Sequence, residues 1–233
     1  MSFLLLAFLG SITSYAAEPI IKNLGESKYC IQVGNVSMTI DASAGAKILS
    51  CKYNDSEIIS QSPMREAFGS TFWTSPQKEW NWPPVEEYDK APYTVEQTSS
   101  SLIMTGQVSQ KFKYRIRKEF KADKKDKAIV ITYSIINESE ETRKVAPWEV
   151  TRVNNEGVIF FDAPLESITP ANRIPFTQEY GVSWYKTDEE KKNRKINADG
   201  KGWLAYCANN LLLVKKFDDL TASQPAPNEA EIQ

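Results

Sequence analysis

The chain has 233 residues, which is enough for one large domain or two small ones. Its 28 basic and 30 acidic residues give a net charge of −2, so no net positive field attracts nucleic acid. Histidine is absent, which excludes a Ser-His-Asp triad, a Cys-His pair, a His-ligated metal and a histidine proton shuttle.

Residues 1–16 have the pattern of an export signal. Residues 3–10 form an apolar run that is shorter than the roughly 20 residues needed to span a bilayer. Ser14 and Ala16 are small residues at the positions that a signal peptidase recognises, which predicts cleavage after Ala16. No Lys or Arg precedes the apolar run, so a buried N-terminal strand is the alternative. The expected mature protein is periplasmic or secreted, with no membrane association after cleavage.

The three cysteines, Cys30, Cys51 and Cys207, lie far apart and are odd in number. One interpretation is a single disulfide with one free thiol. The preferred interpretation is that all three cysteines are buried and pack as small apolar residues. A structural zinc site needs four ligands at close spacing, so no metal is predicted, and no cofactor is predicted either.

Period-two alternation of apolar and polar residues dominates the chain and predicts half-buried strands. The predicted strands are residues 31–33, 36–40, 47–53, 57–59, 101–108, 112–120, 128–137, 144–153, 158–161, 203–207 and 211–215. No long stretch has the apolar spacing of a core helix. Many strands separated by turn signals therefore indicate an all-β fold, an antiparallel β-sandwich.

The strand 112–120 has two distinct faces. Phe112, Tyr114 and Ile116 form its apolar face, and Lys113, Arg115 and Arg117 form its cationic face. Two charge-rich stretches, 121–127 and 187–195, mix both signs and are predicted to be exposed loops, the second with a short surface helix as its alternative.

Residues 60–98 show little alternation and contain five prolines. Loops longer than about 12–15 residues are usually functional or disordered, and disordered segments are poor in aromatic residues. This segment is rich in them: Phe68, Phe72, Trp73, Trp80, Trp82, Tyr88 and Tyr93. A functional segment is therefore predicted.

Three tryptophans of this segment, Trp73, Trp80 and Trp82, suggest a saccharide site. Trp80 and Trp82 would face the same side of an extended backbone, and each indole offers a flat apolar face and one N–H donor. Gln77 adds an amide that suits sugar hydroxyls. The alternative is that the tryptophans fold inward as a plug over one end of the sandwich, and both arrangements can hold for different rings.

Residues 146–152 contain the second candidate, Glu149. On a regular strand Glu149 shares a face with Thr151, while Trp148 and Arg152 share the other face. A carboxylate between large apolar neighbours suggests a cleft in which burial would raise its pKa, with a surface glutamate as the alternative. Arg152 is a further candidate for contact with a ligand. It would reach the same cleft as Glu149 if a bulge after Pro147 changed the face on which it lies.

The sequence resembles a known group at these residues. Residues 44–50 and 54–59 are similar to the opening hairpin of galactose mutarotase-like (aldose 1-epimerase-like) proteins. Residues 69–84 and 147–152 resemble a bacterial branch of that group, the domain of unknown function 4380. The resemblance implies a β-supersandwich over residues 17–233, with a sugar site on the concave face of a large sheet.

Two departures from the family pattern bear on catalysis. Mutarotases place a histidine acid in the region where this chain has Trp148 and Glu149, and the chain has no histidine. The family's general-base glutamate lies on a late strand. Residues 228–233 resemble the first residues of such a strand, so a chain truncated at its C-terminus is expected.

The sequence leaves three functions open. The leading hypothesis is an exported carbohydrate-binding protein that binds a saccharide through Trp73, Gln77, Trp80, Trp82, Glu149 and Arg152. The second is a carbohydrate-active enzyme that uses Glu149 with a carboxylate beyond residue 233. The third is a structural or protein-binding sandwich with the aromatic segment as a partner patch. Neither the sugar nor the oligomeric state is indicated.

Overall fold

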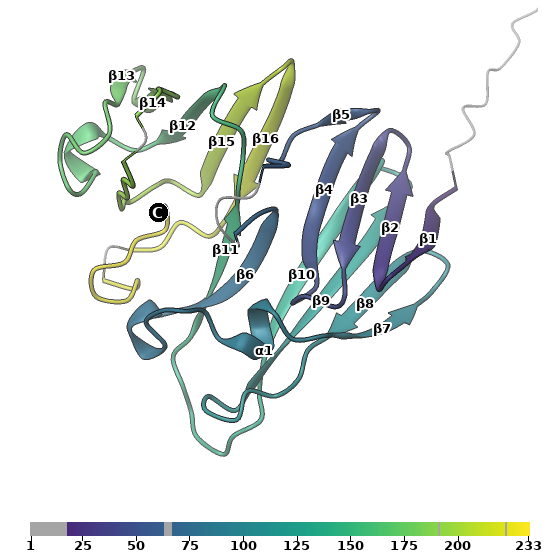
Figure 1. The fold of residues 1–233 in the computed structure, drawn as a ribbon. Helices are drawn as coiled ribbons and strands as arrows, with labels where there is room; N and C mark the ends of the chain where they lie inside the picture. The colour runs from purple at the N-terminus through teal and green to yellow at the C-terminus, as the bar shows by residue number, and fades with distance from the viewer. Residues whose placement is uncertain (1–17, 63–66, 191, 222) are drawn as a thin grey trace, which may run out of the picture.

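The computed structural model of the protein describes residues 18–62, 67–190, 192–221 and 223–233. Its regular structure is almost all β-strand, in three antiparallel sheets, with two short 3₁₀ helices and one short α-helix (Figure 1). The predicted all-β fold with the antiparallel sheets of a β-sandwich is therefore confirmed. The predicted export signal lies outside the described residues.

The first sheet has the strand order β1-β2-β3-β4-β6-β11, and β5 pairs with β4. Its strands are β1 (Ile20–Gly25), β2 (Lys28–Val33), β3 (Val36–Asp41), β4 (Lys47–Tyr53), β5 (Ser56–Glu57), β6 (Ser70–Ser75) and β11 (Ala146–Thr151). Asn54 takes a positive φ of 54° in the turn after β4, as its sequence suggests. β5 is shorter than the predicted strand 57–59.

The second sheet has the order β10-β9-β8-β7 and lies across the first as a second layer (Figure 1). Its strands are β7 (Thr94–Gln97), β8 (Ser101–Thr105), β9 (Tyr114–Asp123) and β10 (Ala128–Asn137). Alternate residues of β9 face the first sheet and are buried: Tyr114, Ile116, Lys118, Phe120 and Ala122. The predicted apolar face of this strand is thus confirmed, and a lysine continues it.

The main hydrophobic core lies between these two sheets. Its fully buried side chains include Ile31 and Ile40 from the first sheet and Leu102, Met104 and Phe120 from the second. Burial of such side chains is worth about 1.5–3 kcal/mol each relative to exposure. The core therefore explains why alternation in the sequence predicts these strands well.

A third sheet, of order β13-β14-β12-β15-β16, lies beside the ends of β6 and β11 (Figure 1). Its strands are β12 (Val158–Asp162), β13 (Thr177–Glu179), β14 (Val182–Lys186), β15 (Trp203–Ala208) and β16 (Leu211–Lys216). A second core cluster packs there around Phe161, Ile168 and Ile196. Ile232 joins this cluster and forms a single antiparallel bridge with Ala198, so residues near 232 are extended there.

The segment 60–98 differs from the expected irregular loop. It contains β6, a 3₁₀ helix η1 (Gln77–Glu79), an α-helix α1 (Glu86–Asp89) and β7. Ser70 to Thr74 of β6 are all buried, because the strand is covered on both faces. A strand buried on both faces does not alternate in polarity, which is why periodicity did not indicate β6.

The cysteines also differ from the preferred interpretation. Cys30, Cys51 and Cys207 are all free thiols, but Cys207 is exposed and the other two are only partly buried. Burial raises the pKa of the Cys51 thiol to about 11. In the part of the chain that the structure describes, no helix has the length and apolar character needed to cross a bilayer.

Candidate functional site

The paired strands β6 and β11 carry most of the candidate residues. In their antiparallel register Trp73 lies opposite Trp148, and Phe72 lies opposite Glu149. Side chains alternate along a strand, so Trp73 and Trp148 share one face of the sheet, while Phe72 and Glu149 share the other. The pairing therefore separates the tryptophans from the carboxylate that the sequence analysis grouped with them.

Four tryptophans, Trp73, Trp80, Trp82 and Trp148, form what we call the tryptophan cluster. The Trp73 ring lies at its centre, edge-to-face with the other three at centroid distances of 5.9 Å (Trp80), 6.0 Å (Trp82) and 5.4 Å (Trp148). Such pairs contribute about 0.5–1.5 kcal/mol beyond their buried area. Trp73 and Trp80 are buried, Trp148 is half-buried, and Trp82 is 67% exposed.

The two buried indoles have their N–H groups bound within the protein. Trp73 Nε1 donates to Oδ1 of Asp89 at 2.8 Å, and Trp80 Nε1 donates to the carbonyl of Thr74 at 2.9 Å. A buried indole N–H needs such a partner, so these rings are held in place by hydrogen bonds as well as packing. The Trp82 ring, by contrast, is mostly exposed to solvent.

The sequence suggested that Trp80 and Trp82 face the same side of an extended segment. In the structure they do not. Trp80 follows η1 in a helical conformation, and Asn81 takes a positive φ of 56°. The left-handed residue reverses the chain between the two rings, so one is buried and the other exposed. Trp73 and Trp80 are buried, as the plug alternative expects, while Trp82 is exposed to solvent.

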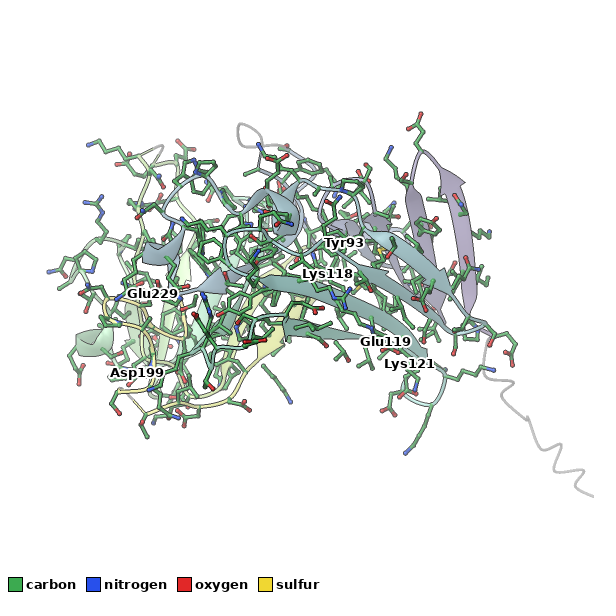
Figure 2. All side chains as sticks on the ribbon, turned by 90° about the horizontal axis from the view of Figure 1, so that it is seen from below. Tyr93, Lys118, Glu119, Lys121, Asp199 and Glu229 are labelled. Carbon is green, nitrogen blue, oxygen red and sulfur yellow. The ribbon has the colours of Figure 1, made fainter. Side chains whose placement is uncertain are left out.

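Gln77 lies at the start of η1, below the tryptophan cluster. Its backbone N–H donates to Oε1 of Glu229 at 2.6 Å, and the Ser75 hydroxyl donates to the other oxygen of the same carboxylate. Its side-chain amide donates to the carbonyl of Asn81 at 3.3 Å. Gln77 therefore organises the turn that presents Trp82, and Glu229 anchors that turn from a distant part of the chain (labelled in Figure 2).

Two cations lie over rings of the tryptophan cluster. The Arg152 guanidinium is 5.7 Å from the Trp73 ring centroid, and Lys195 Nζ is 4.8 Å from that of Trp148. Arg152 extends from the end of β11 on the tryptophan face without the bulge that the sequence analysis considered. Cations over indole faces are stabilised by the ring quadrupole.

A buried polar network lies behind the tryptophan cluster. Lys118 is fully buried, and its Nζ donates to the carbonyls of Gly45 at 2.6 Å and Ala46 at 3.1 Å. It lies 5.6 Å from the ring of Tyr93, beside it in Figure 2. Burial lowers the pKa of Lys118 to about 7, although the nearby Asp89 carboxylate acts in the opposite direction.

Gly45 permits the close approach that builds this network. It has φ of +65°, and a Cβ there would lie 2.5 Å from the carbonyl oxygen of Tyr88 and 2.6 Å from that of Asp89. A side chain at this position would push α1 away from the loop. Glycine thus lets Asp89 approach Lys47 and Lys118.

Glu149 belongs to a different polar cluster on the opposite face. Its Oε1 accepts hydrogen bonds from the hydroxyls of Ser70 and Thr151, and its Oε2 pairs with Lys215 Nζ of β16. The carboxylate is mostly buried, as the sequence suggested, but its oxygens are engaged by protein donors. Its place in the structure is a link between the first and third sheets.

Three polar residues of these clusters were not identified as candidates from the sequence. Lys118 occupies an apolar position in the alternation of β9. A lysine at such a position indicates a buried charge, so the sequence could have identified it as a candidate. Asp89 and Lys215 carry no such signal, because their partners are distant in sequence. Among the described residues, no group of three or more cysteine or acidic side chains is arranged to hold a metal ion.

Two surface depressions lie away from the tryptophan cluster. One is lined by Tyr93, Gly106 and Arg115 together with their neighbours, and the other lies around Gly157 and Cys207. Neither is lined by a residue of the tryptophan cluster.

Comparisons with known proteins add little to this description. No protein-family model matches the chain, and no curated protein matches it. One solved structure with local similarity is the 4-alpha-glucanotransferase from Thermococcus litoralis, at 15% identity and a TM-score of 0.32. The match covers 51% of this chain and only 24% of the enzyme. This likeness is too weak to support an inference about either fold or function.

Proposed function

We propose that this chain is an exported carbohydrate-binding protein that receives a saccharide on the tryptophan cluster. The observation that carries the proposal is the 67% exposed indole of Trp82, held edge-to-face against the buried Trp73 ring. Pyranose rings have apolar C–H faces that stack on such a surface. Trp148, which is half-buried and also edge-to-face with Trp73, extends the aromatic surface.

The anchoring of this surface favours binding over a loose hydrophobic patch. Trp73 and Trp80 are fixed by hydrogen bonds to Asp89 and Thr74, and the turn that carries Trp82 is held by Gln77 and Glu229. A preorganised site loses little conformational entropy when a ligand binds, so stacking contacts retain most of their energy.

The alternative of a carbohydrate-active enzyme has less support. Glu149 lies on the face opposite the tryptophans and is paired with Lys215, so it is not positioned to act on a sugar stacked on Trp82. General acid–base catalysis needs a group within hydrogen-bond reach of the reacting atom. We therefore propose binding without catalysis, and we expect no mutarotation above the uncatalysed rate.

Substitution of single aromatic residues tests the proposal. Trp82→Ala should weaken saccharide binding by about five- to a hundred-fold, because stacking on an aromatic ring contributes up to about 1–3 kcal/mol. It should leave the melting temperature nearly unchanged, since the ring is mostly exposed. Binding is followed by tryptophan fluorescence and calorimetry with a panel of plant and host oligosaccharides.

Two variants serve as controls. Trp80→Ala removes a buried ring and should lower the free energy of unfolding by about 3–5 kcal/mol. Tyr180 is a fully exposed aromatic residue between β13 and β14, so Tyr180→Ala should change neither property. The proposal is wrong if no oligosaccharide binds the parent protein at millimolar concentration, or if Trp82→Ala binds as tightly as the parent.

A further inference from the structure

Two arginines of this chain lie over aromatic rings at the same distance. Arg152 lies over Trp73 and Arg194 over Tyr185, each 5.7 Å from the ring centroid. The Arg194 guanidinium also binds the Asp188 carboxylate at two points, Nη2 to Oδ1 at 2.7 Å and Nη1 to Oδ2 at 3.1 Å. This is the planar two-point arrangement that arginine and carboxylates prefer.

Arg152 resembles Arg194 in lying over an aromatic ring, but it lacks a carboxylate partner among the described residues. The hydrogen bonds of its side chain to described residues all come from Nη1, at the long distances of 3.4–3.5 Å, to Phe68, Gly69 and Thr71. No carboxylate of the described residues forms an ion pair with it. Asp89 attracts it, but from a longer distance than an ion pair, and accepts its hydrogen bond from Trp73. Its Nε and Nη2 have no acceptor in the described part of the chain, and the side chain is half-buried and reachable from solvent.

Arg152 is one of three desolvated cations, with Lys47 and Lys118, that interact with the Asp89 carboxylate. Lys47 is buried close enough to Arg152 and Asp89 to interact with both, and Lys195 lies over Trp148. The Asp89 carboxylate also accepts a hydrogen bond from Trp73, and Glu229, which attracts Lys195, accepts bonds from Ser75 and Gln77. Burial lowers the pKa of Lys47 and of Arg152, so both desolvated cations would be stabilised by an added negative charge.

We infer that the ligand of the tryptophan cluster is an anionic saccharide, whose carboxylate or sulfate group binds Arg152 while its ring stacks on Trp82. This inference rests on the saccharide-binding function proposed above. Trp73 contacts both residues, at 5.7 Å from Arg152 and 6.0 Å from Trp82, so the two contacts lie within the span of a short acidic oligosaccharide. Two oxygens of a carboxylate or sulfate accept the two free guanidinium donors in parallel.

Three matched probes test the inference with the full chain in solution. They are an oligogalacturonate, the neutral galacto-oligosaccharide made by reduction of its carboxyl groups, and a sulfated galacto-oligosaccharide of the same length. We expect at least one anionic probe to bind at least tenfold more tightly than the neutral one. Tighter binding of the uronate identifies a carboxylate as the preferred group, and tighter binding of the sulfated probe identifies a sulfate.

Variants of Arg152 locate the charge recognition. Arg152→Gln should weaken binding of the preferred anionic probe by about 10- to 100-fold, the range for a charge-assisted hydrogen bond, and change binding of the neutral probe by less than about twofold. Arg152→Lys keeps the charge but not the two-point geometry, so an intermediate loss is expected. Arg194→Gln removes the arginine that already has a carboxylate partner and should leave every affinity unchanged.

Salt provides a measurement that does not depend on a folded variant. Binding of the anionic probe to the parent protein should weaken as NaCl rises from 50 to 500 mM, while binding of the neutral probe should not. Equal affinity for all three probes, or an equal loss with Arg152→Gln for anionic and neutral probes, overturns the inference and leaves saccharide binding intact. If none of the three probes nor any other oligosaccharide binds, the proposed function itself fails.

Discussion

Lys118 shows how one residue can depart from the pattern of its strand. It stands in the apolar register of β9, between Ile116 and Phe120, and is fully buried. Its two hydrogen bonds to the Gly45 and Ala46 carbonyls satisfy two donors, which a neutral amine also offers. The N–H groups of Lys118 are thus paired even when the lysine is uncharged.

Lys118 should make stability depend on pH. Burial lowers its pKa from 10.5 to about 7, so between these values the unfolded chain binds more protons than the folded chain. Stability therefore rises with pH across this window, by about 2 kcal/mol from pH 7 to 9 for this single group. Lys118→Met should remove this contribution. Urea unfolding of both proteins at pH 7, 8 and 9 gives the difference, and parallel pH profiles would contradict the assignment.

Asp89 is the acidic member of the buried network. Asp89→Asn keeps an acceptor for Trp73 Nε1 but removes the charge that faces Lys47, Lys118 and Arg152. We expect a loss of about 1–3 kcal/mol, since three desolvated cations lose their shared carboxylate. Thermal unfolding measures it. Asp55→Asn, in the exposed turn after β4, is the matched control and should be neutral.

At the scale of elements, β11 performs two separate tasks. One face places Trp148 beside Trp73 in the tryptophan cluster, and the other places Glu149 against Lys215 of β16. β11 is an edge strand of the first sheet and β16 is an edge strand of the third. Their ion pair therefore connects two sheet edges whose backbone groups are not hydrogen-bonded to each other.

A double-mutant cycle should measure this connection. Glu149→Gln and Lys215→Met should each destabilise the protein, because each leaves a mostly buried charge without its partner. The double variant should lose less than the sum, with a coupling energy of about 1–3 kcal/mol from urea unfolding. The exposed pair Lys28 and Glu26 is the control and should show no measurable coupling. Additive losses at Glu149 and Lys215 would argue against a connecting role.

At the scale of the whole molecule, two hydrophobic clusters are joined by polar contacts. The larger cluster fills the sandwich, and the smaller one packs under the third sheet with Ile232. The contacts between these parts include Glu149 with Lys215, Lys195 over Trp148, and Glu229 with the Gln77 turn. The tryptophan cluster lies at this junction, so the third sheet contributes to the candidate site as well as to the fold.

Export remains a prediction for the whole protein. Residues 3–10 and the small residues Ser14 and Ala16 predict removal of the first 16 residues. When the gene is expressed in a bacterial host, intact-mass analysis of the periplasmic and secreted fractions should find a chain that begins at Ala17. A mature chain that still begins at Met1 would show that residues 1–16 are not an export signal.

Local patterning was sufficient for much of this fold. Alternation predicted β2, β3, β4, β8 to β12, β15 and β16. A strand with one buried face alternates apolar and polar residues, so its sequence shows which face is buried. Alternation also placed Trp148 and Arg152 on one face of β11 and Glu149 on the other. β6 was missed because both of its faces are covered, and β1, β7, β13 and β14 were missed as well. In β14 the buried positions are Ser183 and Tyr185, so its polarity does not mark the buried face.

The sequence by itself determined the class of the fold, the unusual aromatic segment and the absence of histidine chemistry, since these follow from composition and short-range periodicity. Only the tertiary structure decided which tryptophans are buried, that Trp82 is exposed, and that Glu149 is separated from it. It also brought Asp89, Lys118 and Lys215 to their partners, which are distant in sequence or carried on other strands. Contacts of this kind depend on how sheets pack together, and no local pattern of residues encodes them.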